Sequence, residues 1–118
     1  MFRRTIMQSF YYAIRGLLFA FKNERSMWIH TIIALLVVTA ALLLRLTLIE
    51  WMILLLSIFL VLIAETINTA IEINVDLVTK KMRTRAMMAK DVAAGAVFLS
   101  GVNAIIIGII LFVPKVFG

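Results

Sequence analysis

Three long runs of apolar residues, separated by shorter polar stretches, dominate the chain. They cover residues 26–44, 51–64 and 92–114. A helix needs about 20 consecutive apolar residues to cross the hydrocarbon core of a membrane, so the first and third runs are long enough. The second is long enough only if its helix continues through the stretch AETINTAIEINVDLV to residue 78. The pattern predicts an all-α membrane protein with spans at about residues 26–46, 49–78 and 90–114.

A different pattern precedes the first run. Apolar residues recur there at helical spacing, and polar residues lie toward another face; the apolar ones are Phe10, Ile14, Leu17, Leu18 and Phe21. This arrangement is typical of an amphipathic helix that lies in the membrane interface, here at about residues 6–23. The alternative interpretation is a polar-ended extension of the first span.

Composition supports the membrane interpretation. Hydrophobic residues make up 64% of the 118 residues, and the mean hydropathy is +1.12. A soluble domain has about 45–50% apolar residues, and one short chain cannot bury the excess within itself. We therefore expect a single integral-membrane domain over residues 1–118. The chain has no cysteine and one histidine, which excludes thiolate and multi-histidine metal sites.

Charge placement gives the expected topology. Basic residues gather before the first span and between the second and third, and include Arg3, Arg4, Arg15, Lys22, Arg25, Lys80, Lys81, Arg83, Arg85 and Lys90. Basic residues beside spans favour the cytoplasmic side, so the N-terminus should be cytoplasmic and the C-terminus outside. The net charge of +6 is explained by this bias rather than by nucleic-acid binding. The first residues also lack the apolar core and cleavage site of a signal peptide.

The second predicted span carries acidic residues on one face. On a helix of about 3.6 residues per turn, Glu65, Asn68, Glu72 and Asp76 form one stripe. A carboxylate at membrane depth costs at least about 2.5–3.5 kcal/mol, so such residues usually mark a functional site. Two other interpretations are a helix end that protrudes into water and ion pairs that hold helices together. A helix end in water explains Asp76 better than Glu65, because Asp76 is nearer to the basic loop.

Clustered carboxylates without histidine or cysteine favour a hard cation such as Mg²⁺, which leaves its other positions to water and phosphate. A neighbouring carboxylate can act as general base. These parts suit phosphoryl transfer, in which catalysis is mostly positioning and charge neutralisation. The chain has neither a Gly-x-x-x-x-Gly-Lys loop nor a His-Arg-Asp loop, so a kinase of this sequence needs another kind of nucleotide site.

The same stretch AETINTAIEINVDLV, followed by AKDVAAGAV, resembles the small bacterial integral-membrane lipid kinases of the diacylglycerol kinase and undecaprenol kinase family. The upstream stretch IRGLLFAFKNER is similar to the surface helix and turn of that family. The resemblance covers nearly the whole chain. It implies a homotrimer in the bacterial cytoplasmic membrane, with active sites between subunits near the cytoplasmic face. It also implies transfer of the γ-phosphoryl group of MgATP to a lipid hydroxyl.

The resemblance assigns roles position by position. Glu65 corresponds to the general base for the lipid hydroxyl, and Asn68 to a group that positions it. Glu24 and Glu72 correspond to ligands of Mg²⁺. The residues expected on the nucleotide side are Arg15, Glu24, Glu72, Asp76, Lys90 and Asp91. For Lys90 the alternative is a side chain that extends toward the interface as an anchor. For Arg15 the alternative to the nucleotide is the lipid headgroup.

The chain departs from the family pattern at two places. Trp28 stands where relatives often have arginine, and the loop at residues 80–85 is basic where the family usually has an acidic segment. The lipid acceptor is also open between undecaprenol and diacylglycerol. The segment AAGAVF resembles the undecaprenol kinases of the family more than the diacylglycerol kinases, and this resemblance favours undecaprenol.

Two other classes of protein compete with the kinase. A small proton- or cation-coupled transporter also needs acidic residues in the membrane, but near its midplane rather than beside a basic loop. A structural subunit needs them only for pairing. Small residues recur every four positions in the third span, at Ala96, Ser100, Ala104 and Gly108. This spacing permits close helix packing, either within one subunit or in a trimer.

Overall fold

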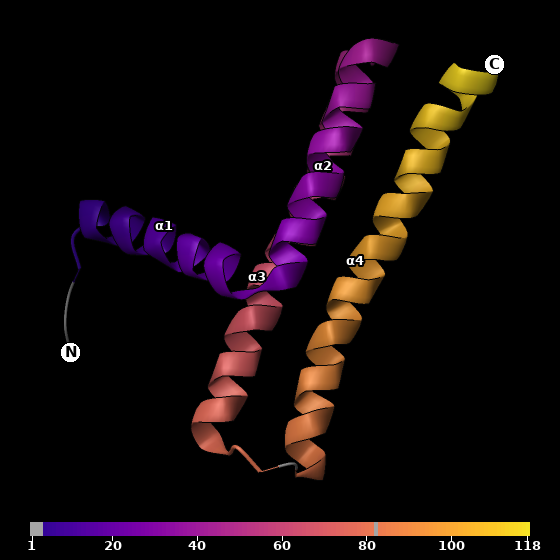
Figure 1. Cartoon of the computed structure of the whole chain (residues 1–118). Coiled ribbons are helices and arrows are strands. Elements are labelled where there is room, and N and C mark those ends of the chain that lie inside the picture. Colours follow the sequence, from indigo (N-terminus) through magenta and orange to yellow (C-terminus); the bar gives the residue numbers. More distant parts are fainter. Residues whose placement is uncertain (1–3, 82) are drawn as a thin grey trace.

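The computed structural model describes residues 4–81 and 83–118, and its regular structure within these residues is helical (Figure 1). The helices are α1 (Ile6–Asn23), α2 (Arg25–Leu44), α3 (Leu48–Val78) and α4 (Thr84–Phe117). Helices α2, α3 and α4 are each long and apolar enough to cross a membrane. The structure thus confirms an all-α protein with three such helices. Arg3, which was counted among the N-terminal charges, lies outside the described residues.

Local sequence signals set the helix ends. Thr5 and Gln8 form a capping box at the start of α1, and Thr47 and Glu50 form another at the start of α3. Each box satisfies backbone N–H groups that have no partner within the helix. Arg45 ends α2 in the left-handed conformation, with φ of 54°, and this turns the chain into α3.

Helix α3 is continuous from Leu48 to Val78. The carboxylate stretch therefore belongs to the same helix as the apolar run before it. Helix α4 is also longer than the span predicted at 90–114, because it begins at Thr84 and continues through Pro114 to Phe117.

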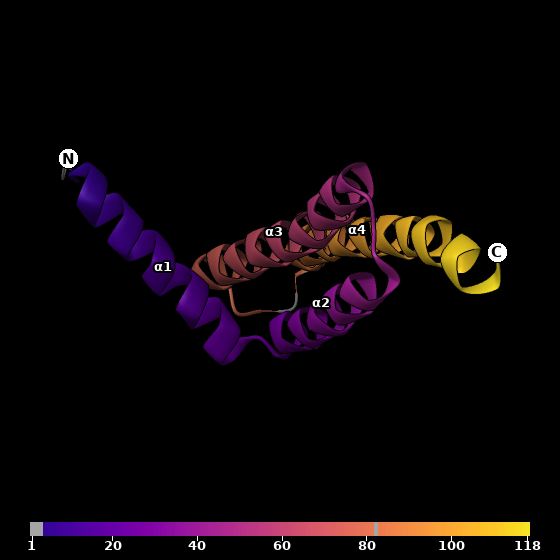
Figure 2. The ribbon, with the colours of Figure 1, turned by 90° about the horizontal axis from the view of Figure 1, so that it is seen from above.

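The four helices form an open arrangement. Helix α4 packs along most of α3, whereas α2 packs along the first part of α3 and contacts α4 little. Helix α1 leaves the others sideways, at the level where α2 begins (Figures 1 and 2). A small core near the α2–α3 turn joins the three long helices and is centred on Ala41, Leu46, Leu54 and Leu111.

Most of the apolar surface is not buried within one chain. In the apolar windows of α2 and α4, 11% of the residues are buried, and in that of α3, 22%. This amount of exposed apolar surface is expected of helices in lipid or of helices that meet further copies.

The small-residue stripe of α4 does not pack evenly. Ser100 is buried, but Ala104 and Gly108 line a cavity of about 360 Å³ between α2, α3 and α4. The homotrimer stays a prediction.

Candidate active site

The acidic residues lie in the second half of α3, from the level of the first turn of α2 onward. Glu65 is level with Ser26, which it contacts, and the helix then continues beyond α1 and α2 (Figure 1). In this outer part α3 has the first turns of α4 beside it. If α1 marks the membrane interface, Glu65 is near the interface and Asp76 is well beyond it.

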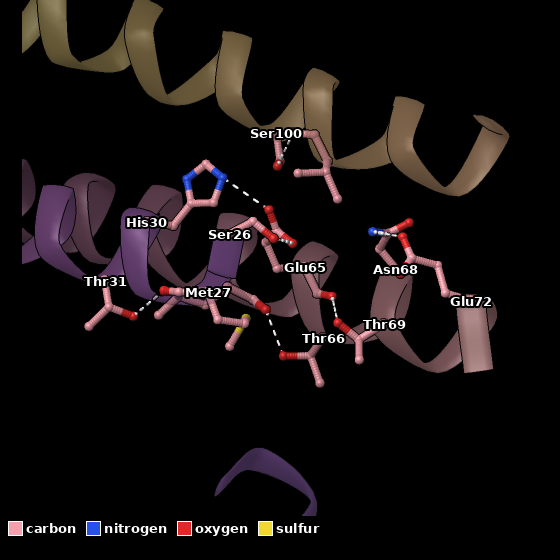
Figure 3. Close-up of polar contacts among 12 residues, drawn as sticks. Ser26, Met27, His30, Thr31, Glu65, Thr66, Asn68, Thr69, Glu72 and Ser100 are labelled. Carbon is pink, nitrogen blue, oxygen red and sulfur yellow. Dashed lines mark hydrogen bonds and ion pairs between the residues drawn. The ribbon is translucent and has the colours of Figure 1, made fainter. Parts of the chain in front are cut away.

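Glu65 is buried against α2. The residue is 3% exposed, and both oxygens of its carboxylate have a partner on α2. Ser26 donates its hydroxyl to Oε2 at 3.0 Å, and Nε2 of His30 lies 3.0 Å from Oε1 (Figure 3). The Thr69 hydroxyl bonds to the Glu65 backbone carbonyl at 3.0 Å. The carboxylate is therefore held in one orientation.

Asn68 and Glu72 form a pair one helical turn further along α3. The Nδ2 group of Asn68 donates to Oε1 of Glu72 at 3.1 Å (Figure 3). The Asn68 carbonyl oxygen, Oδ1, is buried and has no protein partner. Buried polar atoms are usually satisfied, so this oxygen is available to a ligand. The pair leaves the second carboxylate oxygen of Glu72 free of this bond.

Asp76 belongs to a different contact. Its Oδ1 atom lies 2.7 Å from Nζ of Lys90 on α4, and both side chains are partly exposed. Together with Asp91 they line a cavity of about 200 Å³ beside the α3–α4 turn. The basic loop also reaches this cavity, through Lys80 and Lys81. The structure thus brings Asp76, Lys90 and Asp91 together.

Glu24 lies at the corner between α1 and α2, as the N-cap residue of α2. Partial burial raises the pKa of its carboxyl group above the usual value, and the negative charges of Glu72 and Glu65 raise it further. The three carboxylates are therefore close enough to influence one another. A cation between Glu24 and Glu72 would relieve this repulsion.

Arg15 is placed differently from the other predicted site residues. Its guanidinium lies over the rings of Tyr11 and Tyr12 on α1, at 5.7 and 5.9 Å from their centres. Arg4 lies over Tyr12 as well, at 4.5 Å. These cation–π contacts hold Arg15 along its own helix.

Trp28 replaces the arginine expected at the α1–α2 corner. Its ring packs edge-to-face on Phe21, with ring centres 5.8 Å apart, and the residue is about half exposed, at 53%. The contact fixes the corner that carries Glu24. It contributes packing at the position where the resemblance predicts an arginine.

The donor set fits a cation that also binds phosphate. Within residues 4–81 and 83–118, no three acidic or histidine side chains converge closely enough to enclose a metal ion by themselves. Two carboxylates, Glu24 and Glu72, with other positions left to water and phosphate, are the pattern that Mg²⁺ takes in nucleotide sites. The unpartnered Oδ1 of Asn68 is a further oxygen donor beside Glu72.

Sequence reasoning missed Ser26 and His30 as members of the site. Their spacing of four residues puts them on one face of α2. A lone histidine in an otherwise apolar span was the signal, since polar side chains in such segments are costly and usually have a partner. Which side chain it met required the packing of α2 on α3.

Comparison with known proteins identifies the family of this chain. The model of the family described as prokaryotic diacylglycerol kinase matches residues 11–112. An undecaprenol kinase of Bacillus subtilis is 43% identical over 108 residues, which are 92% of this chain and 88% of that relative. A diacylglycerol kinase of Synechocystis is 44% identical over 111 residues, which are 93% of this chain and 63% of that relative. The matched region includes each predicted site residue.

Proposed function

The chain belongs to the prokaryotic diacylglycerol kinase family and is a membrane lipid kinase, and on this premise we propose that it transfers the γ-phosphoryl group of MgATP to undecaprenol. The family match confirms the resemblance predicted from the motif on the second span. A kinase family also favours the kinase over the transporter and the structural subunit. The observation that carries the proposed chemistry is the buried Glu65 carboxylate, held on both oxygens beside Asn68 and Glu72.

In the proposed reaction Glu65 is the general base. The O–H bond of the lipid alcohol breaks and its proton passes to the Glu65 carboxylate. The alcohol oxygen forms a bond to the γ-phosphorus of ATP, and the bond from that phosphorus to the bridging oxygen of ADP breaks. Asn68 orients the reacting groups through its unpartnered Oδ1 atom.

Glu24 and Glu72 would hold Mg²⁺ in this proposal. When bound, the ion supplies neutralisation of phosphate charge. Asn68 holds Oε1 of Glu72 by the bond at 3.1 Å, so it fixes the direction in which that carboxylate points. Burial raises the pKa of the Glu24 carboxyl group, and the negative charge of Glu72 raises it further.

The nucleotide would lie along the cavity beside the α3–α4 turn. Lys80, Lys81 and Lys90 line this cavity and supply positive charge for phosphates. Asp76 holds Lys90 at 2.7 Å, and Asp91 borders the same cavity. We assign Arg15 to the nucleotide as well. Its guanidinium would have to leave Tyr11 and Tyr12 on α1 to contact a phosphate.

Replacing Lys90 by methionine should raise the KM for ATP about tenfold and change kcat less. The reason is that one charge-assisted contact to phosphate is lost, while the base is untouched. Steady-state kinetics with varied ATP at saturating lipid measures this effect. Lys115→Met is the matched control, because Lys115 also pairs with a carboxylate, Glu50 at 3.1 Å, at the start of α3. Equal changes in both variants would contradict the assignment.

The proposal that undecaprenol is the acceptor rests on two observations: the share of each relative that the chain covers, and one sequence segment. The chain spans 88% of the undecaprenol kinase but 63% of the diacylglycerol kinase, at nearly equal identity. The segment AAGAVF at the start of the third span favours the same branch.

Purified protein with radiolabelled ATP should phosphorylate undecaprenol with a kcat/KM at least about tenfold above that for diacylglycerol, in line with discrimination by pocket fit. Both lipids are presented in the same detergent micelles and at the same mole fraction. A preference for diacylglycerol would reverse the acceptor and keep the kinase. The transporter would be favoured if neither lipid is phosphorylated and if vesicles that contain the Glu65→Gln variant show altered ion uptake.

We place the kinase in the bacterial cytoplasmic membrane, with its N-terminus and the α3–α4 turn on the cytoplasmic side, where ATP is available. The basic residues around Lys22 and at 80–85 support this orientation through the positive-inside bias. A homotrimer with active sites between subunits follows from the family resemblance. The large exposed apolar surface of α2 and α4 is compatible with it.

A further inference from the structure

Two donors on α2 face the Glu65 carboxylate. Ser26 and His30 are four residues apart, so they lie one above the other on the same helix face. The hydroxyl of Ser26 meets Oε2 and the imidazole Nε2 of His30 meets Oε1, each at 3.0 Å (Figure 3). With this spacing, each of the two residues reaches a different oxygen of the same carboxylate.

The carboxylate that this pair contacts is buried. The Glu65 side chain is 4% exposed, and the neighbouring Met27 is 1% exposed. Leaving a carboxylate without partners at such a place is strongly unfavourable. Hydrogen bonds to it are correspondingly strong, because the surrounding dielectric is low. Neither donor serves only to hold its own helix, as Thr31 does by bonding to the Met27 carbonyl at 2.7 Å.

We propose that Ser26 and His30 are positioning residues that hold the Glu65 carboxylate in the orientation in which it accepts the proton of the lipid hydroxyl. This inference rests on the proposed function, in which Glu65 is the base. An ionised carboxylate only accepts hydrogen bonds, so Ser26 and His30 are both donors and His30 carries a proton on Nε2. Each carboxylate oxygen keeps a further lone pair for the incoming proton. A base fixed in this way needs no reorganisation when the hydroxyl arrives.

His30 is the donor nearer to the apolar space between the helices. Its side chain is 28% exposed, and it lines the cavity of about 360 Å³ between α2, α3 and α4. The remaining lining of that cavity is almost entirely apolar, including Ile33, Val37 and Phe112. His30 is thus a polar side chain that both lines this space and contacts Glu65.

A purely structural role makes a different prediction. If the two bonds only anchor α2 to α3, their loss lowers the amount of folded protein and leaves the turnover of the folded fraction unchanged. If they orient the base, their loss lowers kcat and leaves the KM for ATP and for lipid nearly unchanged.

The test uses the purified full chain in detergent micelles, with ATP and undecaprenol. His30→Leu should lower kcat about 10- to 100-fold, because a hydrogen bond to a charged group is lost. Ser26→Ala should lower kcat as well, because the second hydrogen bond to the same carboxylate is lost. His30→Gln should recover most of the loss, because its amide nitrogen reaches the position of Nε2. Thr31→Val is the matched control on α2 and should keep the wild-type kcat.

Thermal unfolding and gel-filtration profiles show whether each variant is folded. Should His30→Leu not fold, His30→Gln and His30→Asn decide the matter, since the shorter amide of asparagine cannot reach Oε1. The inference is overturned if Glu65→Gln is inactive while folded His30→Leu, or His30→Asn in its place, keeps the wild-type kcat. It is also overturned if glutamine restores no more turnover than leucine or asparagine. An active Glu65→Gln variant refutes the proposed base instead, and the positioning role falls with it.

Discussion

Replacement of Glu65 by glutamine is expected to lower kcat for lipid phosphorylation by about 10²- to 10⁴-fold, the usual contribution of a general base. The amide has nearly the same size as the carboxylate, but it cannot take up the proton of the alcohol. Glutamine also has only one oxygen to accept from Ser26 and His30, so its NH₂ group faces a donor. Both effects act on the chemical step rather than on ATP binding.

The measurement is kcat at saturating ATP and lipid, with KM for ATP determined on the same samples. Glu50→Gln is the matched control. Glu50 lies in the first turn of the same helix, about 22 Å away by helical rise, and it pairs with Lys115. It should keep nearly the wild-type kcat. A Glu65→Gln variant that turns over within about threefold of wild type would refute the general base, because the expected loss is far larger.

Much of the fold follows from residue patterns that act locally. The apolar runs and the absence of any helix-breaking signal after Ala64 predict that the carboxylate stretch belongs to the second span, and α3 is continuous there. The capping residues Thr5 and Thr47 set helix starts by bonds over three positions. Such features depend on near neighbours, so sequence alone carries them.

The contacts of the acidic stripe depend on packing between helices and were only partly predictable. Periodicity placed Glu65 and Asp76 on the same face of α3, but Glu65 meets α2 whereas Asp76 meets Lys90 on α4. One face of a long helix borders different neighbours along its length, and periodicity does not identify them. For the same reason the sequence did not connect Ser26 and His30, which lie 39 and 35 positions before Glu65, with its carboxylate.

Arg15 is a residue whose contacts in the structure differ from its predicted role. The resemblance predicts that it meets the nucleotide, yet its guanidinium lies over Tyr11 and Tyr12 of its own helix. A cation–π contact with near neighbours is worth about 0.5–1 kcal/mol at an exposed site, so phosphate can displace it. The predicted role therefore requires Arg15 to exchange its contacts with Tyr11 and Tyr12 for a contact with phosphate.

Replacement of Glu72 by glutamine is expected to raise the Mg²⁺ concentration needed for half-maximal activity by at least about 10- to 100-fold, the loss that even outer partners of a metal ligand cause. The bond from Asn68 can persist, because the glutamine oxygen still accepts it. What is lost is the negative charge opposite Glu24. Raised Mg²⁺ should therefore restore part of the activity, whereas it should not restore Glu65→Gln, whose defect is in proton transfer.

Activity is measured over a series of Mg²⁺ concentrations at fixed ATP, and Mn²⁺ binding with a non-hydrolysable ATP analogue is followed by electron paramagnetic resonance. Glu24→Gln should behave as Glu72→Gln does, since the two carboxylates share the ion in the proposed site. Glu50→Gln again serves as the control and should bind Mn²⁺ as wild type does. Unchanged Mn²⁺ binding in both Glu24→Gln and Glu72→Gln would refute the assignment of the metal to these two carboxylates. The raised pKa of Glu24, caused by burial and then by Glu72 and Glu65, would then mark repulsion without a ligand.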